Sequence, residues 1–95
     1  MTTDYIDIGD DHSIKYIEYK EFGPVGINVK HLTKEGKVCN GWVPFKGKAW
    51  EQGFAPGQIE AWDIKSEDPL TLEPSILCTV CGDHGFIRLG RWVVA

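Results

Sequence analysis

The segment CTVCGDH, residues 78–84, constrains the fold more than any other part of this sequence. It carries three side chains that bind soft metals, in a chain with only three cysteines and three histidines. The Cys-x-x-Cys-Gly order can aim two thiolates at one ion, because glycine permits the sharp reversal that follows them. A zinc ion takes four such ligands in a tetrahedron, so upstream residues must supply the remainder. The candidate metal ligands are His31, Cys39, Cys78, Cys81 and His84.

Most of the chain alternates between apolar and polar residues with a two-residue period, which is typical of β-strands. Residues 13–22 also suit a short helix, but their tyrosines and isoleucines favour a strand. Residues 46–57 are expected to form a long loop, with aromatic anchors at Trp50 and Phe54 and a turn at Pro56-Gly57. A further turn is expected at residues 66–69. Strands are expected at residues 5–8, 13–22, 25–32, 37–45, 58–64, 70–72, 75–78, 84–89 and 91–94.

The predicted hairpin of residues 25–32 and 37–45 carries two of the candidate ligands. In the first strand, His31 shares one face with three apolar residues, Val25, Ile27 and Val29. A plain four-residue turn at 33–36 pairs His31 with Val38, which points His31 and Cys39 to opposite faces. A one-residue bulge would bring them to the same face, because a single slip swaps the faces of a strand.

The last predicted hairpin joins residues 84–89 and 91–94 through a turn at Leu89-Gly90. This turn pairs Ile87 with Trp92 across the two strands. No internal repeat or linker divides the sequence, and 95 residues is the size of one domain. We therefore predict a mainly-β fold, a small single-domain antiparallel sheet (residues 1–95) with long loops, stabilised by zinc.

Composition and charge restrict the class of protein. Hydrophobic residues make up 42% of the chain, which fits a packed globule rather than a disordered segment. The net charge of −4 gives an acidic surface that repels phosphates, so nucleic acid is disfavoured as a partner. We see no signal peptide and no apolar run long enough to span a membrane. The expected location is the cytoplasm (the host cytoplasm if the protein is phage-encoded), where thiols stay reduced.

The cysteines and histidines also have simpler interpretations, which stay open at this point. A free cysteine is frequently a small buried apolar side chain, and His31 on an apolar face also suits a hydrogen-bonded core residue. If a metal is bound, a structural role is favoured, because a catalytic zinc keeps one position open beside a carboxylate base. Asp83 is adjacent to the Cys-x-x-Cys pair in sequence, which does not by itself establish the geometry of such a base. His12 follows acidic residues 10–11, and we expect a solvated acidic turn there.

The C-terminal part of the chain carries a longer motif. It consists of Thr-Leu-x-Pro-Ser-Ile at residues 71–76, Cys-x-x-His at 81–84 and Phe-Ile-x-x-Gly at 86–90, with Trp62 upstream. This order resembles a family of small uncharacterised proteins of phages, prophages and bacteria. The resemblance implies phage context and a metal site that includes Cys81 and His84. Many members of that family carry a Cys-Pro-Cys-Gly-Cys element upstream, which this chain lacks, so only His31 and Cys39 can take its place.

The sequence thus predicts a phage-type protein with a structural Zn²⁺ site. It is expected to act as an interaction module on a host or phage macromolecule, most simply a protein, and no residue is assigned to catalysis. The alternative is a metal-dependent hydrolase or nuclease accessory protein, with Asp83 or His12 near an open coordination position. A third hypothesis is a metal-free β module that stacks nucleic-acid bases on exposed tryptophans.

Overall fold

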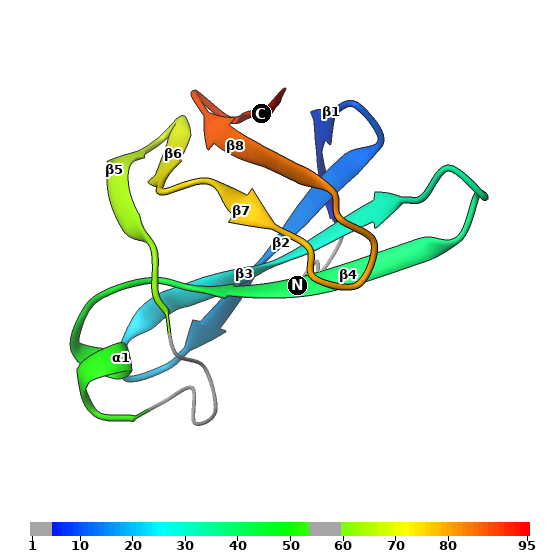
Figure 1. Ribbon diagram of the computed structural model, residues 1–95. Coiled ribbons are helices and arrows are strands. Elements are labelled where there is room, and N and C mark those ends of the chain that lie inside the picture. Colours follow the sequence, from blue (N-terminus) through cyan, green and yellow to red (C-terminus); the bar gives the residue numbers. More distant parts are fainter. Residues whose placement is uncertain (1–4, 54–59) are drawn as a thin grey trace.

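The computed structural model describes residues 5–53 and 60–95, which form nine strands and one short helix (Figure 1). The strands pair antiparallel in three sheets, with the orders β1-β2-β3-β4, β5-β6 and β7-β8-β9. The mainly-β prediction is confirmed. The elements are β1 (Ile6–Gly9), β2 (His12–Tyr19), β3 (Gly23–Leu32), β4 (Val38–Pro44), α1 (Lys48–Glu51), β5 (Asp63–Glu67), β6 (Leu70–Glu73), β7 (Ile76–Leu77), β8 (His84–Arg88) and β9 (Arg91–Val94).

The alternation in β3 directs its side chains as the sequence predicted. Val25, Ile27, Val29 and His31 are all buried, because they share the face that the C-terminal strands cover. Strand β2 pairs with β3 along its whole length and adds buried residues to the same face. In the part of the chain that the structure describes, no helix has the length and hydropathy needed to cross a membrane.

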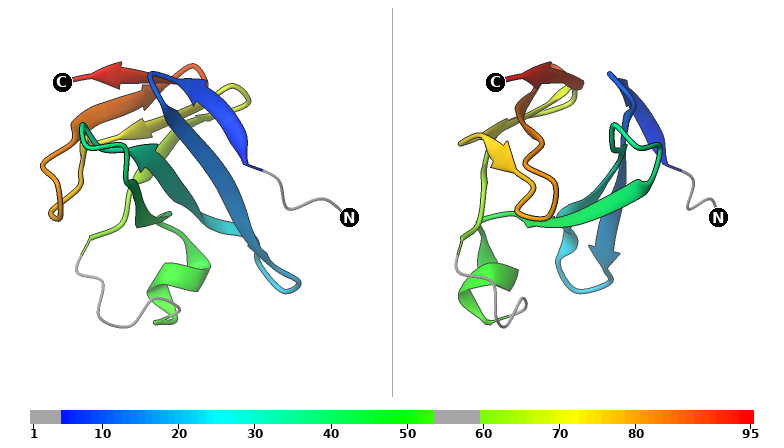
Figure 2. Two further views of the ribbon diagram at one scale, coloured as in Figure 1. Left: turned by 90° about the vertical axis from the view of Figure 1, so that its right-hand side faces the viewer. Right: turned by 45° about the vertical axis from the view of Figure 1, so that its right-hand side comes forward.

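The core lies between the β1–β4 sheet and the strands that follow α1, which lie over one face of that sheet (Figure 2). The turn between β8 and β9 is tied to β6, since the backbone N–H of Leu89 donates to Thr71 Oγ1 at 2.8 Å. The N–H of Gly90 donates to the Leu70 carbonyl, also at 2.8 Å. The buried core residues are Ile8, Ile14, Ile27, Val29, Val43, Phe45, Leu70, Leu72, Ile76, Ile87 and Trp92.

Two glycines are required because tryptophan rings lie directly over them. A Cβ atom on Gly85 would lie 2.5 Å from Cζ2 of Trp92, and one on Gly26 would lie 2.6 Å from Cη2 of Trp42. Both distances are far below van der Waals contact, so only glycine leaves room for the indoles. The C-terminal hairpin has the predicted register, with Ile87 opposite Trp92. Its turn residue Leu89 has φ of 51° and Gly90 has φ of 75°, which defines a type I′ turn.

The predicted turn between β3 and β4 was one residue too short. Strand pairing ends at Leu32 and Val38, so residues 33–37 form the loop and His31 lies opposite Cys39. The loop closes because the N–H of Thr33 donates to the Lys37 carbonyl at 2.8 Å, while Thr33 Oγ1 accepts from the Lys37 N–H at 3.1 Å. The ladder is regular, so the two candidate ligands share a face without the bulge that a four-residue turn would need.

The middle of the chain also differs from prediction. The expected loop at 46–57 contains helix α1, and its predicted anchor Phe54 and turn Pro56-Gly57 lie outside the described residues. The strand predicted at 58–64 begins outside the described residues; of residues 60–64, the last two belong to β5, and Trp62 forms an isolated parallel bridge with Phe45. The predicted turn at 66–69 is confined to residues 68–69.

Candidate metal centre

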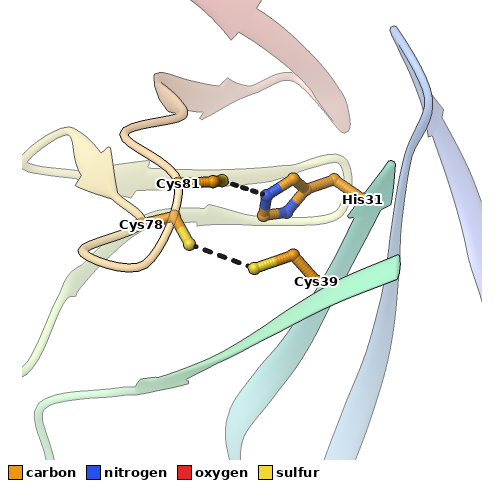
Figure 3. Close-up of side chains that lie close together, drawn as sticks. All are labelled: His31, Cys39, Cys78 and Cys81. Carbon is orange, nitrogen blue, oxygen red and sulfur yellow. Dashed lines mark hydrogen bonds between the residues drawn. The ribbon is translucent and has the colours of Figure 1, made fainter. Parts of the chain in front are cut away.

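Four of the five candidate ligands lie together at one end of the core (Figure 3). Each offers one ligand atom, and these atoms all lie within 4.8 Å of one another. The Sγ atoms of Cys39 and Cys78 are 3.4 Å apart, and His31 Nε2 is 3.1 Å from Cys81 Sγ. We call His31, Cys39, Cys78 and Cys81 the Cys3His group. It joins the β3–β4 hairpin to the loop between β7 and β8.

The hairpin supplies two members of the group through its register. His31 and Cys39 are directly opposite each other, and cross-strand partners point to the same face of a sheet. His31 is 5% exposed and Cys39 is 9% exposed. These two side chains therefore point inward, at the end of β3 and the beginning of β4 respectively.

The loop between β7 and β8 supplies the other two members through a tight backbone turn. The N–H of Gly82 donates to the Cys78 carbonyl at 2.7 Å, and the N–H of Cys78 donates to the Asp83 carbonyl at 2.7 Å. Gly82 has φ of 82°, a conformation that favours glycine. Cys78 is half-buried against the hairpin and Cys81 is exposed on the outer side. This turn is the sharp reversal that the Cys-x-x-Cys-Gly order predicted.

The surroundings of the thiols favour a thiolate at Cys78. Burial raises the pKa of the Cys78 thiol, but backbone N–H groups of Cys81 and Val80 donate to its sulfur, and the balance leaves the pKa below its ordinary value. The hydrogen bond to Cys78, with burial, raises the pKa of Cys39 to about 11. The two sulfurs face each other 3.4 Å apart. A divalent cation bound between them would displace the thiol protons, because thiols lose their protons when they bind a metal.

The His31 ring is held in a stack of three rings. Burial lowers the pKa of His31, and the neighbouring His12 lowers it further against the opposing effect of Asp83. His31 is therefore neutral at neutral pH, which is the form that binds metals. The His12 ring lies between Trp92, with centroids 4.0 Å apart, and His31, with centroids 5.1 Å apart. This stack fixes the plane of the imidazole that faces Cys81.

His12 is buried, so the expectation of a solvated position for it was wrong. Its Nδ1 donates to the Asp10 carbonyl at 2.6 Å, and its Nε2 lies 2.6 Å from Asp83 Oδ2. The same carboxylate oxygen lies 4.0 Å from His31 Nε2. His12, His31 and Asp83 thus form a second group of ligand-type side chains within 4.8 Å of one another. The sequence signal for His12 was its two-residue spacing from buried Ile14, which extends the inward face of β2.

The fifth candidate ligand, His84, lies outside both groups. Its Nε2 is 2.8 Å from Ser75 Oγ, and its side chain is exposed. The cause is strand alternation in β8, where Gly85 and Ile87 point inward, so His84 shares the outward face with Arg88. The Cys-x-x-His spacing of residues 81–84 therefore does not bring the two side chains to one point.

A groove of about 510 Å³ lies beside the Cys3His group. Cys81 and Asp83 form part of its wall, so one sulfur of the group is accessible from it. Leu32 and Val94 contribute exposed apolar surface to the same groove. The exposed sulfur makes the centre accessible to solvent on one side, while the other three members are partly or fully covered by protein.

Comparison with known proteins gives no family for this chain. No protein-family model, curated protein or solved structure matches it. The Cys3His group and its surroundings are therefore the features from which a function can be inferred.

Proposed function

We propose that this protein is a small β module held together by one structural zinc ion, and that it acts by binding another macromolecule. The observation that carries the proposal is the convergence of His31, Cys39, Cys78 and Cys81 on one point. Three sulfurs and one imidazole are a donor set that zinc favours in structural sites. The four donors come from two segments that are far apart in sequence, so one ion would cross-link them.

The spacing of the donors suits a tetrahedral ion. Zinc–sulfur bonds of about 2.3 Å place two sulfurs of one tetrahedron about 3.8 Å apart. The Cys39 and Cys78 sulfurs are 3.4 Å apart, so a small outward movement accommodates the ion. With all four positions taken by protein, no site is left for a reacting water, which favours a structural role over a catalytic one.

Metal content tests the zinc site. In protein purified without added metal, we expect about one zinc per chain, measured by elemental analysis. The Cys39→Ser and Cys81→Ser variants should lose most of it, because each removes one ligand. His84→Ala is the matched control, since His84 lies outside the group and its removal should leave the zinc content unchanged. Equal zinc content in all four proteins would contradict the proposal.

An interaction role is supported by apolar surface beside the group. Val80, at the tip of the Cys-x-x-Cys turn, is 83% exposed, and Leu32 and Val94 of the groove are 49% and 65% exposed. Exposed apolar residues gathered at one place are typical of interaction surfaces. The net charge of −4 favours a basic protein as the partner. The resemblance of the C-terminal segment adds phage context to this proposal.

Capture experiments with paired variants test the interaction role. A partner retained by the wild-type protein should be lost by the Leu32→Ser/Val94→Ser double variant, because both changes remove apolar surface from the groove. Ile64→Ser is the control, since Ile64 is exposed outside the groove. A partner that binds all three proteins equally, or no partner above background, would count against the groove as the interaction surface.

The second candidate function is a metal-dependent hydrolase or nuclease accessory. It is favoured by the group of His12, His31 and Asp83. In this group the Asp83 carboxylate lies 4.0 Å from His31 Nε2, and Asp83 also lines the groove. Metal removal separates the two functions. A structural zinc is lost together with the fold, whereas a catalytic metal is lost with activity while the fold survives.

A further inference from the structure

The three cysteines of the Cys3His group differ in their access to solvent. Cys39 is buried at 9% exposure, Cys78 is half-buried and Cys81 is exposed. Of the three, Cys81 alone lines the groove of about 510 Å³ beside the group. The susceptibility of a cysteine to oxidants follows its exposure and its thiolate character, and a sulfur that binds a metal is a thiolate. A small oxidant in solution therefore reaches Cys81 first.

Cys78 lies in the same backbone turn as Cys81. The N–H of Gly82 donates to the Cys78 carbonyl at 2.7 Å, which closes one turn of the chain. The Cα atoms of residues three apart in such a turn lie within about 7 Å, and disulfides usually join Cα atoms about 4.4–6.8 Å apart. The backbone N–H groups of Val80 and Cys81 also donate to the Cys78 sulfur and hold it within this turn. A bond between the two sulfurs would therefore leave the β3–β4 hairpin where it is.

We propose that Cys81 is a site of reversible oxidation by hydrogen peroxide, and that Cys78 completes the reaction by forming a disulfide with it. In the first step, the Cys81 thiolate attacks one peroxide oxygen, the O–O bond breaks, and Cys81 becomes a sulfenic acid as hydroxide leaves. In the second step, the Cys78 thiolate attacks the Cys81 sulfur, the S–S bond forms, and the S–O bond breaks as a second hydroxide leaves. Two protons from solvent convert both hydroxides to water, so the two thiolates lose two electrons and the peroxide gains them.

This oxidation would release the metal ion. The release of zinc rests on the proposed function, whereas the disulfide needs only the two thiols. Because the thiolate is the form that binds a metal, the disulfide leaves Cys39 and His31 as the remaining members of the group. A structural zinc takes four protein ligands, so two do not hold it. The hairpin and the loop between β7 and β8 then lose their cross-link, and a dithiol reductant restores the thiols by exchange.

The test is treatment of the zinc-loaded full chain with a small excess of hydrogen peroxide. We expect zinc to appear on a chromophoric chelator as the disulfide forms. The products are identified by blocking the free thiols with iodoacetamide, without reduction, and analysing tryptic peptides by mass spectrometry. Cleavage after lysine and arginine places Cys39 in residues 38–46, and Cys78 and Cys81 together in residues 66–88. Peptide 66–88 should be unalkylated and lighter by about 2 Da, the two hydrogens lost, while peptide 38–46 should be alkylated.

Two variants separate the steps, and the result for the wild-type chain does not depend on how they fold. Cys78→Ser removes the thiol that attacks in the second step, so dimedone, a reagent for sulfenic acids, should label Cys81. Cys39→Ser is the matched control, because the disulfide in peptide 66–88 should still form without Cys39. A dimedone label at Cys39 in place of Cys81 would overturn the assignment of the first step.

The outcomes separate this inference from the proposed function. The disulfide within residues 66–88 with loss of zinc supports both. The same disulfide in protein that binds no zinc upholds the oxidation site and overturns the metal centre, and the disulfide in protein that keeps its zinc overturns the ligand roles of Cys78 and Cys81. Zinc-bound protein that keeps all three thiols, or that links Cys39 to either other cysteine, overturns the oxidation site and leaves the metal centre standing.

Discussion

At the scale of single residues, Asp83 connects the Cys3His group to the rest of the protein. Its backbone carbonyl accepts from the Cys78 N–H at 2.7 Å, and its carboxylate contacts His12 Nε2 at 2.6 Å. His12 in turn stacks on His31. Asp83 thus fixes the loop that carries two cysteines and, through His12, the ring of His31. Groups that orient metal ligands in this way contribute to affinity without touching the metal.

We predict that Asp83→Asn weakens zinc binding by about 10–100-fold, the usual effect of removing such an orienting group. The amide keeps the size of the side chain but removes the charge that faces His12. Competition with a chromophoric zinc chelator measures the affinity. Asp63→Asn is the control, because Asp63 pairs with exposed Lys46 at 3.4 Å and lies outside both ligand-type groups. Equal zinc affinity in Asp83→Asn, Asp63→Asn and wild type would refute the role of Asp83.

At the scale of elements, the two hairpins carry the packing that positions the site. In the C-terminal hairpin, the Trp92 indole lies flat over Gly85 and its other side stacks on His12. The indole can take this position because residue 85 is glycine and has no side chain. This hairpin supplies no member of the Cys3His group. It affects that group through the stacked rings of Trp92, His12 and His31.

Gly85→Ala should lower the free energy of unfolding by about 1–3 kcal/mol, the usual cost of overpacking. The added Cβ would lie 2.5 Å from Trp92 Cζ2 and 2.6 Å from the Val93 carbonyl oxygen, and that backbone oxygen cannot easily move. Urea unfolding measures the change. Gly41→Ala is the matched strand control, because a Cβ there meets nothing within 4 Å. If both variants unfold at the same urea concentration, the account of the Trp92 packing is wrong.

The elements also show how far the sequence determines this structure. Alternation predicted the inward face of β3, and the Leu89-Gly90 turn predicted the register of the C-terminal hairpin, because each depends on residues that are close together in sequence. The length of the loop at residues 33–37 depends on hydrogen bonds between Thr33 and Lys37, which no periodicity reveals. The difference between a four-residue and a five-residue loop decides whether His31 and Cys39 share a face.

For the site, residue types identified the side chains that are able to bind a metal, but not how these side chains group in space. Four of the five candidates converge, and His84 does not, because it begins β8 on the outward face. The contact of His12 with Asp83 joins residues 71 positions apart, and such a contact follows from the packing of two sheets rather than from any local pattern.

At the scale of the whole molecule, the core is thin, so a cross-link between distant segments would add substantially to the stability of the fold. A chain of this length buries only about two-thirds of the surface that its unfolded form exposes. Structural zinc in small domains contributes about 10–16 kcal/mol of apparent binding free energy, which is comparable to the whole stability of a typical domain. The Cys3His group joins residues 31 and 39 to residues 78 and 81, so the metal would hold together the first and last parts of the fold.

Zinc removal should therefore lower the melting temperature by at least about 15 °C. A decrease of only about 4 kcal/mol in the free energy of unfolding is enough to produce this shift in a domain of this size. Circular dichroism melts with and without a strong chelator measure it, and added zinc should restore the original value. Cys39→Ser is the control, because a protein that lacks the site should not respond to the chelator. An unchanged melting temperature in the chelated wild-type protein would show that the fold does not depend on metal.

The most direct test of the central claim is X-ray absorption at the zinc edge of the purified protein. We predict a first shell of three sulfurs at about 2.3 Å and one nitrogen at about 2.0–2.1 Å. The spectrum of His84→Ala should be identical. A shell made mainly of oxygen and nitrogen, or protein without zinc, would contradict the claim that His31, Cys39, Cys78 and Cys81 bind one structural ion.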